Sequence, residues 1–191
     1  GDYVNLCYRM PPKFGAIRRV SVYQDQNSVK RNLNLYTISE GADGNLTSTN
    51  TTIKENLKTW IQQHKMLNDT IDILDAYIIN LEIDFIVTGD RQYTPERTLT
   101  DCLQALNEKF SVLPEMGEPF KTRDVYKVLN KLDSVLDVMD VQIGQKSGGV
   151  YSSNEYSIPL NTTPDGAQVL ISVNMIYEIK FPNVNIKGEV R

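Results

Sequence analysis

The stretch IDILDAYIINLEIDFIV, residues 71–87, decides the fold class. Its second half alternates between two sets of residues, Ile79, Leu81, Ile83, Phe85 and Val87 in one and Asn80, Glu82, Asp84 and Ile86 in the other. Successive side chains of a strand point to opposite faces, so this pattern predicts a strand with one buried and one largely solvated face. Asp69, Asp72 and Asp75 come just before it, and we expect one of them to cap or end a turn.

A helix is predicted immediately before this strand. Its apolar positions are spaced by four, three, four and three residues: Ile53, Leu57, Trp60, His64 and Leu67. That spacing places all five on one helix face. Asn50 or Thr51 can cap the start of the helix.

The first 48 residues alternate extended runs with turn signals. Residues 16–24 and 32–38 are the extended runs, and residues 39–49, which hold Gly41 and Asp43-Gly44, predict a turn or exposed loop. No run in the chain reaches the roughly 20 apolar residues of a membrane span, and we expect no membrane contact.

Two further helices and two strands are predicted after residue 90. The second helix follows from Leu99, Cys102, Leu103, Leu106 and Phe110, with Thr98 and Asp101 placed for its capped start. The third follows from Val125, Val128, Leu129, Leu132, Val135 and Leu136. Met139, Val141 and Ile143 then predict a short strand, and the alternation of residues 169–181 predicts a long final strand.

These elements predict an α+β fold, with a mixed or antiparallel sheet covered on one side by about three helices. We expect two regions: residues 1–48, made of strands and a turn, and residues 49–191, which form the α+β domain. Since the chain does not begin with Met, we also expect a fragment of a longer protein.

No pattern in the chain predicts catalysis, a metal or a cofactor. Cys7 and Cys102 have no second Cys nearby, and phosphate-binding glycine loops and nucleophile motifs are missing. His64 lies on an apolar helix face and is expected to be structural. The formal net charge of −4, without a basic cluster, argues against binding nucleic acid.

Residues 144–168 form a long polar stretch that nevertheless holds four larger apolar or aromatic residues: Tyr151, Tyr156, Ile158 and Leu160. Tyr is favoured at interfaces, because it offers a large contact area, a polar tip and little entropy to lose. We therefore predict that these four residues contact a neighbouring subunit or a second copy of the chain. The alternative is a loop folded back over its own sheet.

The run LNLYTISEGADGNLTSTNTTIKENLKTWIQQHKMLNDTIDILDAYIINLEIDF, residues 33–85, resembles the C-terminal part of the baseplate wedge protein of T-even-like contractile-tailed phages, in the wider baseplate J-like group. The shared pattern is an extended NLY segment, a turn, a helix of the LKxxI type and an entry into a long strand. Residues 9–25, RMPPKFGAIRRVSVYQD, are similar to the entry of that region.

This resemblance implies a virion structural protein of the tail baseplate, assembled in the host cytoplasm. Such a protein pairs with a second copy of itself, contacts other wedge subunits and links neighbouring wedges into a ring around the hub. Two other classes stay open on the residues alone. One is a ligand-binding or regulatory α+β domain with a small-molecule pocket, and the other is a hydrolase that uses Glu82 and Asp84, about 7 Å apart on one strand face.

Overall fold

The computed structural model describes residues 2–27, 29, 31–65 and 69–191 of the chain. It forms two compact units. The first unit comprises Gly1–Ile78, Glu115–Gly117 and Ser172–Ile176, and the second comprises Ile79–Pro114, Glu118–Ile171 and Tyr177–Arg191. Both contain helices and mixed sheets, which confirms the α+β class. The expected region 1–48 lies within the first unit, and a domain boundary after residue 48 stays a prediction.

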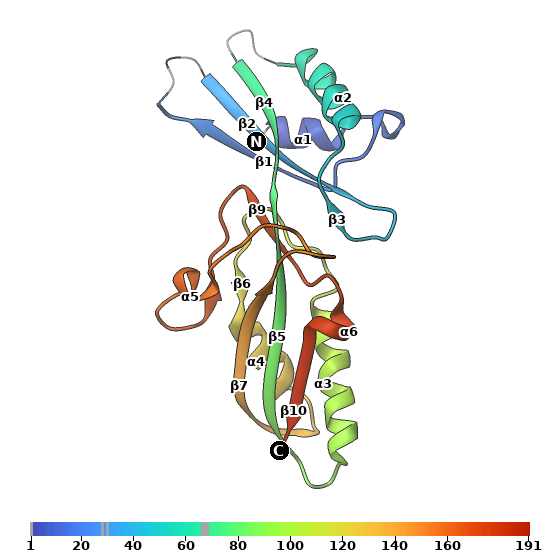
Figure 1. The fold of residues 1–191 in the computed structure, drawn as a ribbon, viewed down its shortest axis with the longest axis vertical. Helices are drawn as coiled ribbons and strands as arrows, with labels where there is room; N and C mark the ends of the chain where they lie inside the picture. Colours follow the sequence, from blue (N-terminus) through green and yellow to red (C-terminus); the bar gives the residue numbers. More distant parts are fainter. Residues whose placement is uncertain (1, 28, 30, 66–68) are drawn as a thin grey trace. The chain divides into compact units, whose positions relative to one another are not determined.

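The first unit is built around strand β2 (Figure 1). This strand pairs antiparallel with β1 and β3 and parallel with β4. The elements are α1 (Asp2–Tyr8), the 3-10 turn η1 (Pro12–Phe14), β1 (Arg19–Asp25), β2 (Arg31–Glu40), β3 (Leu46–Thr47), α2 (Thr51–Gln62) and β4 (Asp69–Asp75). The two extended runs and the turn predicted in the first 48 residues are thus confirmed.

Helix α2 closes the core of the first unit. Asn50 caps its start by accepting a hydrogen bond from the Ile53 N–H at 2.8 Å, as predicted. Leu57 is fully buried with Leu33 and Leu35 of β2. The helix ends at Gln62, so His64 lies beyond it and is exposed, which corrects its expected place on the buried face. Leu67 lies outside the described residues.

The three aspartates before residue 76 lie in a strand, and the predicted turn there is wrong. They belong to β4, which runs parallel to β2. Asp69 is buried, accepts a hydrogen bond from the Tyr3 hydroxyl, and lies 3.6 Å from the Arg31 guanidinium. Asp75 pairs with Lys54 at 2.7 Å. These partners explain how a strand can carry residues that usually favour turns.

The second unit is built around strand β5. It pairs parallel with β10, antiparallel with β7, and also with β9. Helix α3 packs on β10 and α4 on β7, so that both cover one face of the sheet (Figure 1). The elements are β5 (Tyr77–Gly89), α3 (Pro95–Lys109), β6 (Phe120–Lys121), α4 (Thr122–Asn130), β7 (Val135–Lys146), α5 (Ile158–Asn161), β8 (Gln168–Val169), β9 (Met175–Glu178), α6 (Pro182–Asn185) and β10 (Ile186–Val190).

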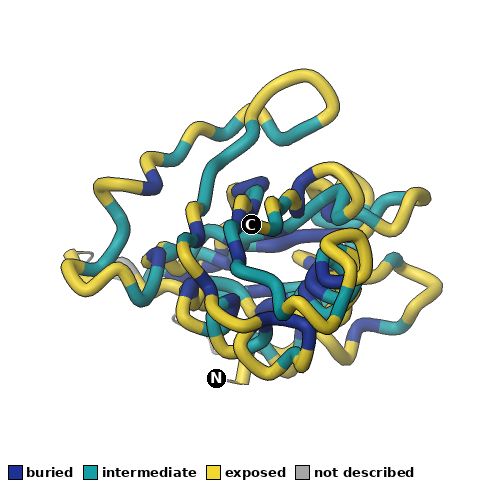
Figure 2. Tube along the Cα trace, turned by 90° about the horizontal axis from the view of Figure 1, so that it is seen from below, coloured by how far each residue is buried: buried dark blue, intermediate teal, exposed yellow. Residues whose placement is uncertain are grey.

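The predicted alternation of β5 is confirmed over its second half. Ile83, Phe85 and Val87 are buried, whereas Asp84 is exposed. The ring of Phe85 lies over Gly188 of β10, where an added Cβ would come within 2.0 Å of the ring. This close approach fixes the pairing of β10 with β5. Exposed residues form most of the outer bends of the trace in Figure 2, whereas buried residues concentrate in its interior.

Both helices of the second unit differ from their predicted bounds. Helix α3 begins one turn earlier than expected, because Thr94 caps it by accepting from the Arg97 N–H at 3.2 Å. Thr98, expected at the start, lies buried inside the helix. Helix α4 ends at Asn130, and Val135, expected in the helix, instead begins strand β7.

The long final strand predicted over residues 169–181 is wrong. A turn at Ser172 interrupts it, where the Met175 N–H donates to the Ser172 carbonyl at 3.0 Å. Only β8 and β9 form there, and in β9 the fully buried residue is Ile176, whose neighbour Tyr177 was expected inside. Strand β10, after Pro182, was not predicted.

Candidate subunit interface

The four predicted interface residues lie on the segment that follows β7. This strand continues to Lys146, beyond the expected start of the loop. A tight turn comes next, with the Tyr151 N–H donating to the Gly148 carbonyl at 3.0 Å. Gly148 and Gly149 have φ values of 78° and 60°, a backbone conformation that glycine adopts without strain. The turn sends the chain back alongside the sheet.

A buried amide holds this segment to the sheet. The Ser152 N–H donates to Oδ1 of Asn80 on β5 at 2.7 Å, and the same side chain donates through Nδ2 to Glu178 on β9 at 3.3 Å. Asn80 is almost fully buried. Since a buried amide is costly unless it is hydrogen-bonded, these bonds fix the path of the segment.

Tyr151 is anchored within the second unit. Its hydroxyl accepts a hydrogen bond from Nδ2 of Asn185 at 3.0 Å, and its ring meets Phe181 edge to face at 5.7 Å between centroids. Lys180 donates to the neighbouring Val150 carbonyl. Tyr151 therefore has both its ring and its polar tip engaged, while part of its surface stays accessible.

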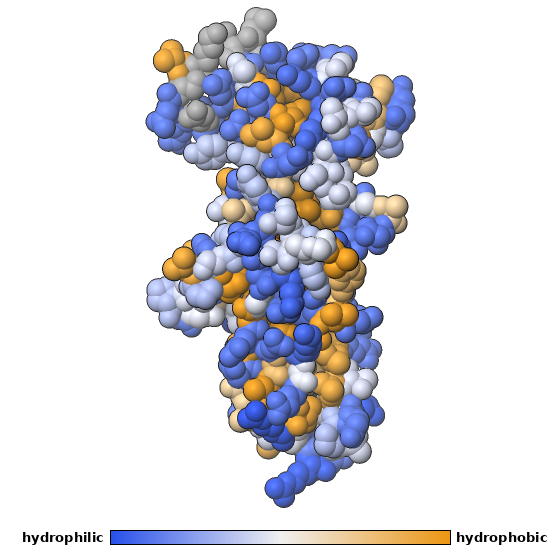
Figure 3. Space-filling model, in the orientation of Figure 1, coloured by the Kyte–Doolittle hydropathy of each residue, from blue (hydrophilic) through white to orange (hydrophobic). Residues whose placement is uncertain are grey.

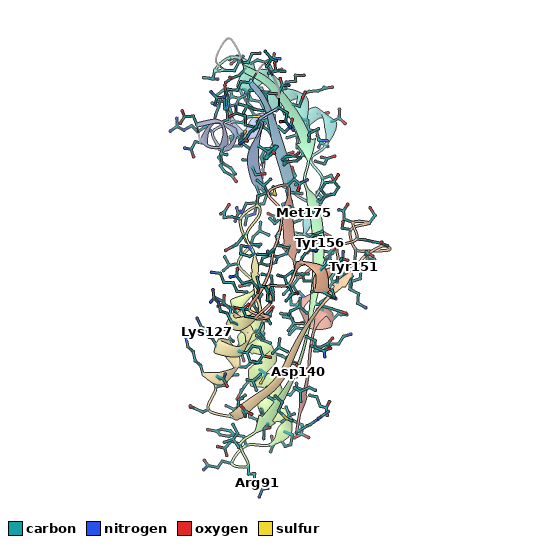
Figure 4. All side chains as sticks on the ribbon, turned by 90° about the vertical axis from the view of Figure 1, so that its left-hand side faces the viewer. Arg91, Lys127, Asp140, Tyr151, Tyr156 and Met175 are labelled. Atoms are coloured by element: carbon teal, nitrogen blue, oxygen red, sulfur yellow. The ribbon has the colours of Figure 1, made fainter. Side chains whose placement is uncertain are left out.

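Tyr156 is held in a similar way. Its N–H donates to Oε1 of Gln145 at 2.9 Å, and its hydroxyl donates to the Leu170 carbonyl. Burial raises the pKa of the Tyr156 phenol above its ordinary value. The two tyrosines, labelled in Figure 4, thus hold the segment to α6 through Tyr151 and to β7 and Leu170 through Tyr156.

Helix α5 separates one buried from one exposed interface candidate. Ile158 is buried, and Ser157 caps the helix by accepting from the Leu160 N–H at 3.5 Å. Leu160 is 87% exposed. Leu170, 50% exposed, lies beside the same turn, because its N–H donates to the Asn161 carbonyl at 2.8 Å.

The structure thus divides the predicted residue set. Tyr151, Tyr156 and Ile158 make contacts within their own unit, whereas Leu160 leaves most of its side chain free for another molecule. Leu170 was not singled out from the sequence, because the alternation of residues 169–181 suggested a core strand there. Figure 3 shows apolar surface of this kind dispersed among polar residues on the drawn face of the molecule.

The two carboxylates considered for hydrolysis lie in different surroundings. Glu82 lies 3.6 Å from the Lys146 ammonium and against Gly144, whereas Asp84 is exposed. Within the described ranges no group of three His, Cys, Asp or Glu residues could hold a metal ion.

The two cysteines are buried and unpaired. Burial raises the pKa of Cys7 to about 12 and, together with Asp101, that of Cys102 to about 11. A thiol with such a pKa stays protonated at neutral pH and is a poor nucleophile.

The first unit contains a cavity of about 650 Å³. Its lining includes the apolar Leu6, Val22 and Leu33 and the charged Asp2, Arg9 and Arg31. His64 also reaches the cavity, with its ring packed on Trp60 at 4.9 Å between centroids. The cavity has the size of a small-molecule site, which bears on the ligand-binding alternative.

The chain is similar in fold to a solved baseplate structure. No family model and no curated protein matches the chain. Among solved structures, it is similar to a chain in the cryo-EM structure of the anti-feeding prophage (AFP) baseplate, 6-fold symmetrised, with a TM-score of 0.56 and 10% sequence identity. The match covers 93% of this chain and 36% of that chain.

This likeness shows that the fold is shared with part of a baseplate protein, in agreement with the resemblance of residues 33–85 at the level of the fold. The chain spans only 36% of the length of the protein that it matches. Within the described part of the chain, no helix is long and apolar enough to cross a membrane.

Proposed function

We propose that the chain is a structural, non-catalytic part of a contractile-tail baseplate, and within it a wedge subunit of the J-like group. The observation that carries this proposal is the fold match, which extends over 93% of the chain. The resemblance of residues 33–85 to wedge proteins supports it independently of the fold. The whole protein would reside in the virion tail after assembly in the host cytoplasm.

In this role the chain pairs with a second copy, contacts other wedge subunits and links neighbouring wedges into a ring around the hub. It needs neither nucleic acid nor a membrane. The exposed end of α5 supports such contacts, because Leu160 offers apolar area on a segment whose backbone is fixed by internal hydrogen bonds. A pre-ordered segment loses little entropy when a partner binds.

The test replaces Leu160 by Ser, with Val112→Ser as the matched control. Val112 is 76% exposed and lies in the same unit, outside the proposed interface. We expect Leu160→Ser to weaken association with a second copy, or with purified wedge proteins, by roughly fivefold or more, as loss of a buried Leu side chain implies. Light scattering of the chain, alone and in mixtures, measures this.

Equal assembly by the two variants would remove Leu160 from the interface. The tyrosines serve as a second control, because changing Tyr151 and Tyr156 to Ser breaks bonds within the unit. A large drop in melting temperature without an assembly defect in the folded fraction would show that they act only in folding.

The cavity of the first unit supports the ligand-binding alternative. A thermal shift with a panel of small carboxylates and phosphates tests it, since the guanidinium of Arg9 lines the cavity. Stabilisation that is lost on Arg9→Gln would favour this alternative. An unchanged melting temperature across the panel would argue against the ligand-binding alternative.

A further inference from the structure

The outer edge of strand β7 lies open along its first half. The strand pairs with β5 on one side and is the last strand of the sheet on the other. In the part of the chain that the structure describes, no backbone hydrogen bond reaches residues 136–142 from outside this pairing. Seven residues of strand extend over roughly 23 Å, enough for several main-chain hydrogen bonds to another strand.

Two β-bulges change what this strand exposes. The pairing skips Met139 opposite the step from Ile86 to Val87 of β5, and it skips Leu136 opposite the step from Thr88 to Gly89. Buried residues therefore recur at every third position, Val135, Val138 and Val141. The two bulged residues are left outside the core, Leu136 at 68% and Met139 at 51% exposure. A regular strand would have buried one of every two residues.

The charges beside the bulged residues are all negative. Asp137 is exposed and Asp140 half-buried, and neither forms an ion pair with any described residue. Figure 4 faces this side of the unit, with Asp140 on β7 and Lys127 extending from α4 away from it. Two copies of this edge would set aspartates against each other, which disfavours pairing of β7 with itself.

We propose that the outer edge of β7 accepts an extended segment of another protein that carries one apolar and one basic residue in every three, in the period of this edge. Main-chain hydrogen bonds to residues 136–142 supply the pairing, Leu136 and Met139 supply apolar contact, and Asp137 and Asp140 select the basic side chains. This inference depends on the geometry of the edge, not on the baseplate role or on Leu160.

Two synthetic heptapeptides test it, one that repeats Val, Lys and Thr (the Val/Lys peptide) and one that repeats Val, Glu and Thr (the Val/Glu peptide). With the Val/Lys peptide at ten times its Kd, we expect the outward amides of residues 136–142 to exchange hydrogen roughly tenfold more slowly, because about a tenth of the edge stays free. The Val/Glu peptide should leave these amides unchanged.

Variants separate strand addition from simple charge attraction. The double variant Asp137→Lys and Asp140→Lys should reverse the preference between the two peptides. The double variant Leu136→Ser and Met139→Ser should weaken binding of the Val/Lys peptide roughly fivefold, whereas Val112→Ser should leave its binding unchanged. Binding without slower exchange at residues 136–142, equal binding of both peptides, or no binding by either would overturn the proposal.

Discussion

The two units build their sheets on the same plan and finish them differently. In each, a central strand has an antiparallel neighbour on one side and a parallel neighbour on the other: β1 and β4 beside β2, and β7 and β10 beside β5. The edge strands β4 and β7 differ in their aspartates: Asp69 and Asp75 of β4 have cationic partners, whereas Asp137 and Asp140 of β7 form no ion pair with a described residue. The difference indicates which edge can attract a basic partner.

Side chains from outside strand β4 contact the aspartates at both of its ends. Tyr3 and Arg31 engage the carboxylate of Asp69, and Lys65 donates to the backbone carbonyl of the same residue at 3.2 Å. Lys54 of α2 pairs with Asp75 at the other end. Carboxylates that already have cationic partners attract a basic segment less than unpaired ones do. We therefore expect the second unit, rather than the first, to bind such a segment.

The largest effect is expected from a substitution in the core of the first unit. Leu57→Ala removes a fully buried side chain from α2 and should lower the free energy of unfolding by about 2–5 kcal/mol. Trp60 is the only tryptophan and lies in the same unit, so its fluorescence in a urea titration reports this unit. The exposed neighbour Lys58→Ala is the control. A loss below about 1 kcal/mol would contradict the packing described for α2.

A smaller loss of stability is expected in the second unit from Gly188→Ala. The added Cβ would come within 2.0 Å of the Phe85 ring, and overpacking of this kind costs about 1–3 kcal/mol. Circular dichroism should show a lower melting temperature, and Lys187→Ala should not. Adding Phe85→Leu should restore part of the loss. If Gly188→Ala were neutral, β10 would not be fixed against β5 by this contact.

The smallest effect depends on pH. Burial, followed by Glu118 and Asp124, raises the pKa of Tyr177 to about 12. The folded state therefore holds this proton more tightly than the unfolded state, and the resulting stability is full below pH 10 and lost as pH rises toward 12. We expect about 1 kcal/mol, since the ring is only partly buried. The free energy of unfolding, measured at pH 9 and at pH 11.5, should fall less in Tyr177→Phe than in the wild type, because the variant has no phenol to ionise.

Local pattern predicted the elements whose burial follows the ideal period. The alternation around Phe85 and the four-three spacing through Leu57 led to β5 and α2, because each has one face inside a core. The α+β class followed from these two elements. Asn50 was likewise found from sequence, since its cap involves only the next three residues.

Long-range contacts decided the rest. Asp69 and Asp75 sit in a strand because Tyr3, Arg31 and Lys54 come to them from other elements. Leu136 appeared to continue a helix, because the bulges of β7 replace alternation by a three-residue period that imitates one.

The candidate interface was only partly predictable from the sequence. Tyr151, Tyr156, Ile158 and Leu160 were singled out together by composition, and local sequence could not reveal which would be engaged internally. The hydroxyl partners of the two tyrosines lie outside the segment: Asn185 is 34 residues from Tyr151, and Leu170 is 14 residues from Tyr156. Leu160 remains exposed although Ile158 of the same short helix is buried.

The most direct measurement of the proposed role is a cryo-EM reconstruction of contractile tails purified from the source of this chain. We expect the two units in every wedge of the baseplate, with the end of α5 and Leu160 buried against a neighbouring subunit. Tails that lack the chain, or a baseplate in which Leu160 faces solvent in every copy, would contradict the proposed role and the proposed interface respectively.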